Sequence, residues 1–142
     1  MAKTFSTIAD RRRRGPYDAE LALRTPESVA VSVTTSTTRI AFPVRKTNAF
    51  KVCFDIDPYT GYAAGTAEWT VAVDVSATVG GASTVIGTIA PAVFAGAAGE
   101  TEIAFGGDEI TDRLATAEFI GLVLTKTGAP GNLTVSAWIV PL

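Results

Sequence analysis

The feature that most constrains the fold is an alternation of apolar and polar residues with a period of two, which recurs from residue 27 to the C-terminus. The clearest example is the segment 68–75. Its apolar positions are Trp69, Val71, Val73 and Val75. Its polar positions include Glu68, Thr70 and Asp74. Successive side chains of a strand point to opposite faces, so this segment predicts a strand with one face in a core and the other in water.

Similar alternation marks the segments 28–35, 38–42, 49–57, 82–89, 99–105, 118–125 and 132–140. The residues expected to face inward in three of these strands are Val29, Val31 and Val33; Phe50, Val52, Phe54 and Ile56; and Leu133, Val135, Ala137 and Ile139. About eight short strands with turn-forming residues between them favour a sandwich or barrel over alternating βα units. We therefore predict an all-β fold, an antiparallel β-sandwich of jelly-roll-like type, over residues 27–142.

The connections between these segments support the strand predictions. The segments 58–61 and 127–132 carry the proline and glycine residues that are typical of tight turns. One short helix is predicted within residues 107–117, because Asp108 can cap it and Ile110, Leu114 and Ala117 fall on one helical face.

Residues 1–26 differ in kind from the rest, and we predict that they form an extended basic arm. Residues 1–14 contain five basic residues and one acidic residue, a net charge of +4, whereas the remainder contains seven basic and thirteen acidic residues, a net charge of −6. The basic residues include the run Arg11, Arg12, Arg13 and Arg14. Such an arm can reach an acidic partner, including a neighbouring copy of the same body. Direct contact with nucleic acid is a further hypothesis that we do not favour, because no aromatic residues interrupt the run.

The composition excludes several classes of site. The chain contains no histidine, which removes the usual Ser-His-Asp and Cys-His arrangements and histidine-containing zinc sites. The single cysteine, Cys53, has no second thiol with which to form an internal disulfide, and a small side chain under another strand or loop is its simplest role. No apolar run approaches the ~20 residues of a membrane-spanning helix, and no secretory signal is recognisable. We expect no membrane insertion, and nothing in the sequence supports secretion.

Two acidic clusters remain as candidates for chemistry. Asp55 and Asp57 lie two apart on the outer face of a predicted strand, where they could point to solvent or hold Ca²⁺ with a nearby carbonyl. Asp108, Glu109 and Asp112 form the second cluster, and paired carboxylates can also hydrolyse glycosides. Neither cluster has an EF-hand spacing, and solvated acidic residues explain both. We therefore expect no catalytic residue, no cofactor and no metal, and hence not an enzyme.

The aromatic residues suggest a binding surface. Trp69 is in phase with buried valines, so we predict that it belongs to the core. Tyr59 and Tyr62 lie in a glycine-rich loop and are predicted to be exposed. Trp138 falls between inward-facing residues and therefore points outward, which suggests a subunit contact or a bound ligand.

The layout resembles a known group of proteins. The basic arm precedes a sandwich rich in Thr, Val and Gly, and residues 118–142 form a C-terminal hairpin, EFIGLVLTKTGAPGNLTVSAWIVPL. These features resemble small virion proteins of tailed bacteriophages, in particular capsid decoration or cement proteins with β-sandwich or jelly-roll bodies. The resemblance implies a structural protein that assembles in the host cytoplasm, sits on an assembled shell and bridges coat subunits with its arm. It carries over no catalytic residues.

Two functions of different classes follow. The first is a capsid cement or decoration protein, or a neck or tail subunit, whose partners are the major capsid protein or other virion subunits and which is expected to form a homo-oligomer. The second is a carbohydrate-binding sandwich that uses Tyr59, Tyr62 and Trp138. The strand order, the oligomeric state and the identity of the arm's partner stay open at this point.

Overall fold

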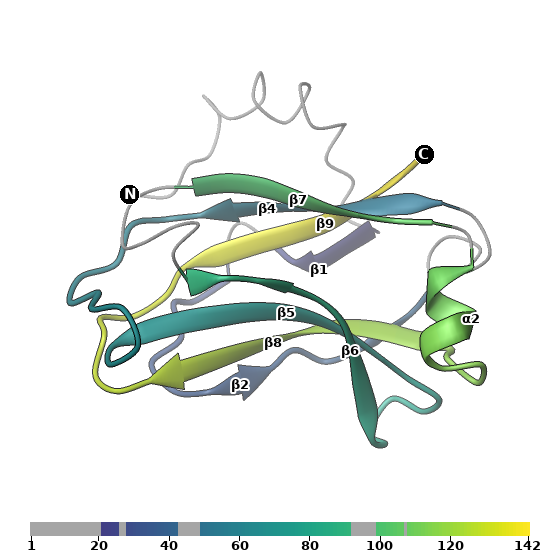
Figure 1. The fold of residues 1–142 in the computed structure, drawn as a ribbon, viewed down its shortest axis with the longest axis horizontal. Helices are drawn as coiled ribbons and strands as arrows, with labels where there is room; N and C mark the ends of the chain where they lie inside the picture. The colour runs from purple at the N-terminus through teal and green to yellow at the C-terminus, as the bar shows by residue number, and fades with distance from the viewer. Residues whose placement is uncertain (1–20, 26–27, 43–48, 92–98, 107) are drawn as a thin grey trace.

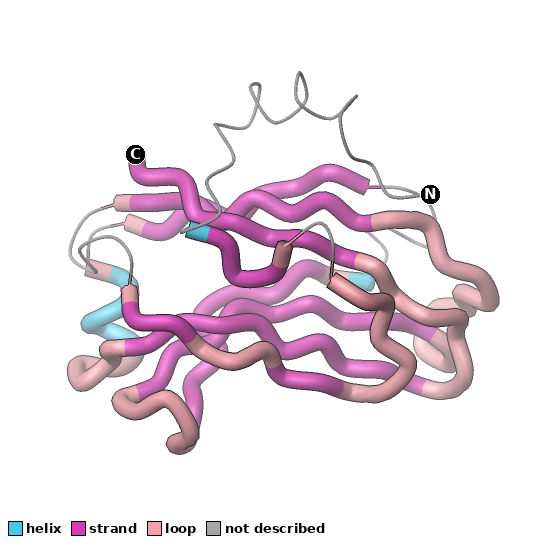
Figure 2. Tube along the Cα trace, turned by 180° about the vertical axis from the view of Figure 1, so that it is seen from behind, coloured by secondary structure: helices cyan, strands magenta, loops and turns pink. Residues whose placement is uncertain are grey.

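The computed structural model describes residues 21–25, 28–42, 49–91, 99–106 and 108–142 (Figure 1). Two antiparallel β-sheets face each other and enclose the core. Seen from behind, the strands run along the length of the molecule and many of the loops collect at its two ends (Figure 2). The prediction of an all-β sandwich is confirmed.

The first sheet has the strand order β1-β9-β4-β7. Its members are β1 (Ala22–Arg24), β9 (Val135–Pro141), β4 (Phe50–Ile56) and β7 (Gly99–Phe105). The central ladder joins β4 to β9 over its whole length, from Phe50 opposite Pro141 to Ile56 opposite Val135. The C-terminal strand is therefore an inner strand of this sheet.

The second sheet has the order β2-β8-β5-β6, with β3 also paired to β8. Its members are β2 (Thr35–Ser36), β3 (Ile40–Ala41), β8 (Phe119–Thr127), β5 (Glu68–Ser76) and β6 (Ser83–Ile89). The ladder between β5 and β8 is the longest described, running from Glu68 opposite Thr127 to Ser76 opposite Phe119.

The connectivity is that of a jelly roll. β2 and β3 pair in succession along the same edge of β8, so they are two pieces of one interrupted strand. When they are counted as one, the described residues form eight strand positions, with the sheet orders 1-8-3-6 and 2-7-4-5. All neighbouring strands are antiparallel, as in double-sheet jelly rolls.

The inward faces of the central strands agree with the sequence pattern. All side chains predicted to face inward from β4, β5 and the 132–140 segment are buried in one hydrophobic cluster: Phe50, Val52, Phe54, Ile56, Trp69, Val71, Val73, Val75, Leu133, Val135, Ala137 and Ile139. The short helix is also confirmed as α2 (Glu109–Arg113), with Ile110 completely buried against the core. The Asp108 side chain makes no capping hydrogen bond, in contrast to the prediction.

The prediction of a strand over residues 28–35 is wrong. Val29 and Val33 are 84% and 63% exposed, and the segment contributes only a single bridge between Val31 and Leu133 before β2 begins. A hydroxyl group interrupts the ladder, because the backbone N–H of Lys126 donates to the Thr34 hydroxyl instead of to a carbonyl. Serine and threonine side chains compete with backbone groups in this way.

The sandwich also begins earlier than residue 27. Residues 22–24, which the sequence predicts to belong to the arm, form β1 and pair with β9. Leu23 is buried in the core, and this burial explains why the segment joins the sheet.

Two glycines with positive φ provide a matched test of the turn geometry. Gly128 has a φ of +68°, and a Cβ atom there would lie 1.9 Å from the Thr66 carbonyl oxygen, whereas Gly65 has a φ of +78° with no neighbour within 4 Å. We expect Gly65→Ala to lower the free energy of unfolding by about 1 to 2 kcal/mol through backbone strain alone. Gly128→Ala should cost about 2 to 5 kcal/mol, because overpacking adds to that strain. Urea unfolding measures the loss of stability in both variants. Equal losses would contradict the predicted clash between a Cβ atom at residue 128 and the Thr66 carbonyl oxygen.

Candidate interaction surfaces

The outer face of the first sheet carries three of the residues singled out in the sequence. Because Phe50, Val52 and their alternate neighbours face the core, Lys51, Cys53 and Asp55 lie on the opposite face of β4. The register places Cys53 between Trp138 of β9 and Glu102 of β7. This face therefore brings together side chains from three strands.

The centre of this face is apolar and buried. Cys53 and Trp138 are completely buried and Val140 nearly so, and these three residues form a hydrophobic cluster separate from the core. We call them the outer cluster. The prediction that Trp138 points away from the core is confirmed by this separation, but the expectation that its ring is available on the surface is wrong. The prediction of Cys53 as a covered small side chain is confirmed.

Charged groups lie beside the outer cluster. Lys51 Nζ lies 3.0 Å from Glu102 Oε2, and the Cys53 thiol lies 3.9 Å from the same carboxylate oxygen. The Glu102 side chain is 43% exposed, so its ion pair with Lys51 is a surface pair, which contributes about 0 to 1 kcal/mol. Because the thiol is buried, it is not an accessible nucleophile in this structure.

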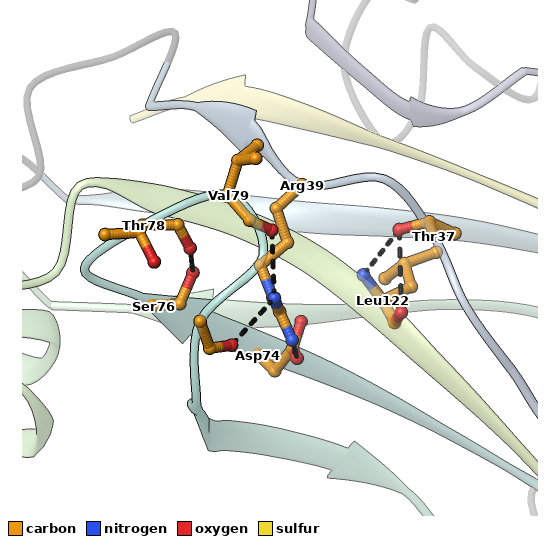
Figure 3. Close-up of polar contacts among 8 residues, drawn as sticks. Thr37, Arg39, Asp74, Ser76, Thr78, Val79 and Leu122 are labelled. Carbon is orange, nitrogen blue, oxygen red and sulfur yellow. Dashed lines mark hydrogen bonds and ion pairs between the residues drawn. The ribbon is translucent and has the colours of Figure 1, made fainter.

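The outer face of the second sheet holds a buried ion pair that the sequence pattern does not indicate. Asp74 of β5 was expected to face water, but its side chain is 1% exposed and accepts hydrogen bonds from Arg39. Arg39 Nε and Nη2 lie 3.2 and 2.9 Å from Asp74 Oδ2. The Arg39 Nη1 atom donates to the Val79 carbonyl oxygen at 3.2 Å (Figure 3). The same atom donates to the Gly81 carbonyl oxygen at 3.3 Å.

Arg39 thus links the segment between β2 and β3 to β5 and to the turn between β5 and β6. Thr37 strengthens the attachment, since its N–H donates to the Leu122 carbonyl. Its hydroxyl also accepts from the Leu122 N–H at 2.9 Å (Figure 3). Gly121 makes room for this crossing, because a Cβ atom there would lie 2.8 Å from Arg39 Cγ. Glycine inside a strand marks such close approaches, and Gly121 was the sequence signal that could have indicated this contact.

Tyr59 is buried, so the prediction of its exposure is wrong. Its hydroxyl oxygen accepts a hydrogen bond from the Trp69 backbone N–H at 3.3 Å, and its ring packs edge-on against Tyr62, which is partly buried. Trp69 belongs to the core, as predicted, and its indole N–H donates to the Gly131 carbonyl at 2.8 Å. The tyrosines therefore join the loop after β4 to the start of β5.

The acidic clusters form no described metal site. Asp55 is buried rather than solvated, whereas Asp57 is partly exposed, so the expectation that both point to solvent is wrong for Asp55. Glu109 accepts a hydrogen bond from the Gly106 backbone N–H at 2.9 Å, as part of the entry to α2. Among the described residues, no group of three or more Asp, Glu, Cys or His side chains could hold a metal ion.

The predicted partner-binding residues Arg11, Arg12, Arg13 and Arg14 lie outside the described residues. Within the described part of the chain, no helix is long and apolar enough to cross a membrane. The sequence matches no protein-family model, and no curated protein is significantly similar to it.

The two ion pairs differ in burial and provide a matched comparison. We expect Arg39→Met to lower the free energy of unfolding by about 3 to 5 kcal/mol, because it leaves the buried Asp74 carboxylate without its cation. Lys51→Met should cost at most about 1 kcal/mol, because its partner is half exposed. Chemical denaturation of the two variants tests this difference. Similar losses in both would show that Asp74 does not depend on Arg39.

A second prediction concerns alkaline pH. Burial raises the pKa of the Tyr59 phenol above its usual 10.0, and nearby Tyr62 and Glu68 act in the same direction, while the hydrogen bond from Trp69 opposes them. Tyr59 therefore contributes stability that is fully present below pH 10 and is lost as the pH rises through the folded-state pKa.

Tyr59→Phe should reduce this alkaline loss and should itself cost about 1 kcal/mol at pH 8, since the hydrogen bond from Trp69 is removed. Tyr62→Phe is the control and should keep the alkaline loss. Urea midpoints at pH 8 and above pH 10 provide the measurement. An unchanged alkaline loss in Tyr59→Phe would contradict the assignment.

Proposed function

We propose that this chain is a structural protein of a bacteriophage virion, a capsid cement or decoration protein that binds coat subunits through its basic N-terminal arm. The observation that carries the proposal is the jelly-roll connectivity of the body, combined with the opposite charges of arm and body. Jelly rolls are recurrent in viral capsid proteins, lectin domains and cupins. Because a fold hosts several functions, the choice among these depends on the side chains.

The side chains favour the virion role over a lectin or a cupin role. Cupin-type metal sites depend on histidine, and the sequence has none. A lectin that stacks sugars on aromatic rings needs those rings at the surface, whereas Tyr59 and Trp138 are buried. The carbohydrate-binding alternative therefore retains only Tyr62 of its three predicted residues.

Opposite charges give the arm a physical role. The net charge of +4 on residues 1–14 is attracted to acidic surfaces, and the net charge of −6 on the remainder makes a neighbouring copy one such surface. An arm that bridges two subunits adds contact area across their boundary and so resists their separation. A coat subunit or a neck or tail subunit provides the same kind of partner.

The body presents features that suit docking on a larger assembly. β6 lies at the edge of the second sheet and exposes Val85, and edge strands are sites where other chains can pair. Arg113 of α2 donates to the Val85 carbonyl at 3.4 Å, so part of this edge is already covered. Docking on a shell would cover the rest.

Co-sedimentation with capsids of the encoding phage, assembled without this protein, tests the proposal. The full chain should pellet with the capsids, and replacing Arg11 to Arg14 with alanine should weaken binding at least about tenfold, since four charge contacts are lost. The matched control is Lys51→Ala with Lys126→Ala, which removes positive charge from β4 and β8, away from the β6 edge, and should leave binding largely intact. Failure of the full chain to bind at any salt concentration would refute the proposal.

A further inference from the structure

We propose that the chain associates head to tail with a second copy of itself, through two oppositely charged surfaces on opposite sides of the sandwich. The basic surface consists of residues 28–34 with Arg24 and Lys126. The acidic surface consists of residues 108–112 with Val85 of β6. The inference concerns the body of the protein, so it goes beyond the proposed role of the arm and does not rest on it.

The basic surface contains apolar side chains that lie in water. Residues 28–34 connect β1 to β2, and Val31 in their middle bridges to Leu133. On either side of this bridge, Val29 and Val33 are 84% and 63% exposed. Exposed apolar side chains that gather on one surface mark sites where another molecule binds. The segment is therefore a candidate contact surface.

Two cations flank these valines. Arg24 Nη2 donates to the Val29 carbonyl oxygen, and Lys126 Nζ donates to the Ser32 carbonyl oxygen at 2.8 Å. Within the described part of the chain, neither cation forms an ion pair with a carboxylate. Residues 28–34 contain no charged side chain, so the basic surface has a net charge of +2. These charges favour an acidic partner.

The acidic surface lies on α2, beside β6 (Figure 1). Asp108, Glu109 and Asp112 are exposed, and the Asp108 side chain makes no capping hydrogen bond. Arg113 follows them, so residues 108–113 contain three acidic residues and one basic residue, a net charge of −2. Arg113 also contacts Val85, which is 45% exposed. This surface therefore combines negative charge with an exposed valine.

The two surfaces lie on opposite sides of the sandwich. β1 and β2 are edge strands of the two sheets, and residues 28–34 pass between them. β7 and β6 are the opposite edge strands. They lie one over the other, because a Cβ atom at Gly87 of β6 would be 3.2 Å from the Phe105 ring of β7. One molecule therefore cannot bring its own two surfaces together.

Complementarity of charge identifies the partner as a second copy. The net charge of +2 on one surface matches the net charge of −2 on the other, and both surfaces expose valines beside their charges. Two basic surfaces or two acidic surfaces would repel each other. Each copy therefore contributes its basic surface to one neighbour and its acidic surface to the next, as in the heterologous interfaces of rings and filaments.

Two surface variants of the full chain test this arrangement. Val29→Glu with Val33→Glu neutralises the basic surface and removes its apolar contact, whereas Asp108→Lys with Asp112→Lys gives the acidic surface a positive charge. All four side chains are exposed, so both variants should fold normally. Each variant alone should associate at least about tenfold more weakly than the unsubstituted chain, because the attraction between its surfaces is lost. Sedimentation velocity up to about 1 mM protein measures the association.

A mixture of the two variants is the decisive sample. The valine variant keeps the natural acidic surface, and the aspartate variant keeps the natural basic surface. Each mixed pair therefore rebuilds one complete contact and should form a 1:1 complex with about the affinity of the unsubstituted chain. The matched control is Thr60→Glu with Ala64→Glu, which adds two negative charges at exposed loop residues and should leave association unchanged.

Four results would overturn the proposal. The first is an unsubstituted chain that stays monomeric at about 1 mM. The second is a pair of surface variants that associate as well as the unsubstituted chain, and the third is a mixture that stays monomeric. The fourth is loss of association when Arg11 to Arg14 are replaced with alanine, because the arm would then be the source of the contact.

These outcomes are separate from those of the capsid experiment. A chain that associates head to tail but never binds capsids would retain this inference and lose the proposed function. A chain that binds capsids through its arginines but stays monomeric in solution would do the opposite.

Discussion

Two long antiparallel ladders, β4 with β9 and β5 with β8, are the constraint on which the rest of the structure depends. Both join residues that are distant in the sequence, such as Phe50 with Pro141 and Glu68 with Thr127. Loop-closure entropy must be offset before these contacts form, and the large apolar side chains between the sheets, Trp69 among them, supply the compensating burial. Once both ladders exist, the remaining strands can add only at their edges, which gives the jelly-roll order.

The inward faces could be predicted from the sequence because a strand has an exact period of two. The burial of Trp69 and its alternate valines could be predicted without knowing which strands pair with β5. The helical spacing of Ile110, Leu114 and Ala117 located α2 in the same local way. The outer faces could not be predicted, since burial there depends on segments that arrive from elsewhere in the chain. The sequence pattern predicts a solvated Asp74, because its partner Arg39 is distant in the chain. The local sign that Arg39 passes over β8 is a single glycine, Gly121.

The binding residues illustrate the same limit. Tyr59 was expected in solvent because its loop is rich in glycine, but the hydroxyl accepts the Trp69 N–H and the ring turns inward. The failed strand at residues 28–35 differs: its valines alternate correctly, yet the Thr34 hydroxyl accepts the Lys126 N–H of β8 in place of a carbonyl, and Val29 and Val33 are exposed. The period of two indicates which side chains can share a face. Whether the strand forms also depends on side-chain hydroxyls that compete with backbone carbonyls for hydrogen bonds.

The buried residues on the outer faces of the two sheets are stabilised by different interactions. On the second sheet, a buried ion pair and bonds to Val79 and Gly81 hold the cover in one geometry, and breaking them would leave a charge without its partner. On the first sheet, Trp138 and Cys53 make apolar contacts, which are non-directional. The segment that covers the second sheet is therefore fixed in one geometry by directional bonds, whereas the outer cluster of the first sheet is stabilised by burial of apolar surface.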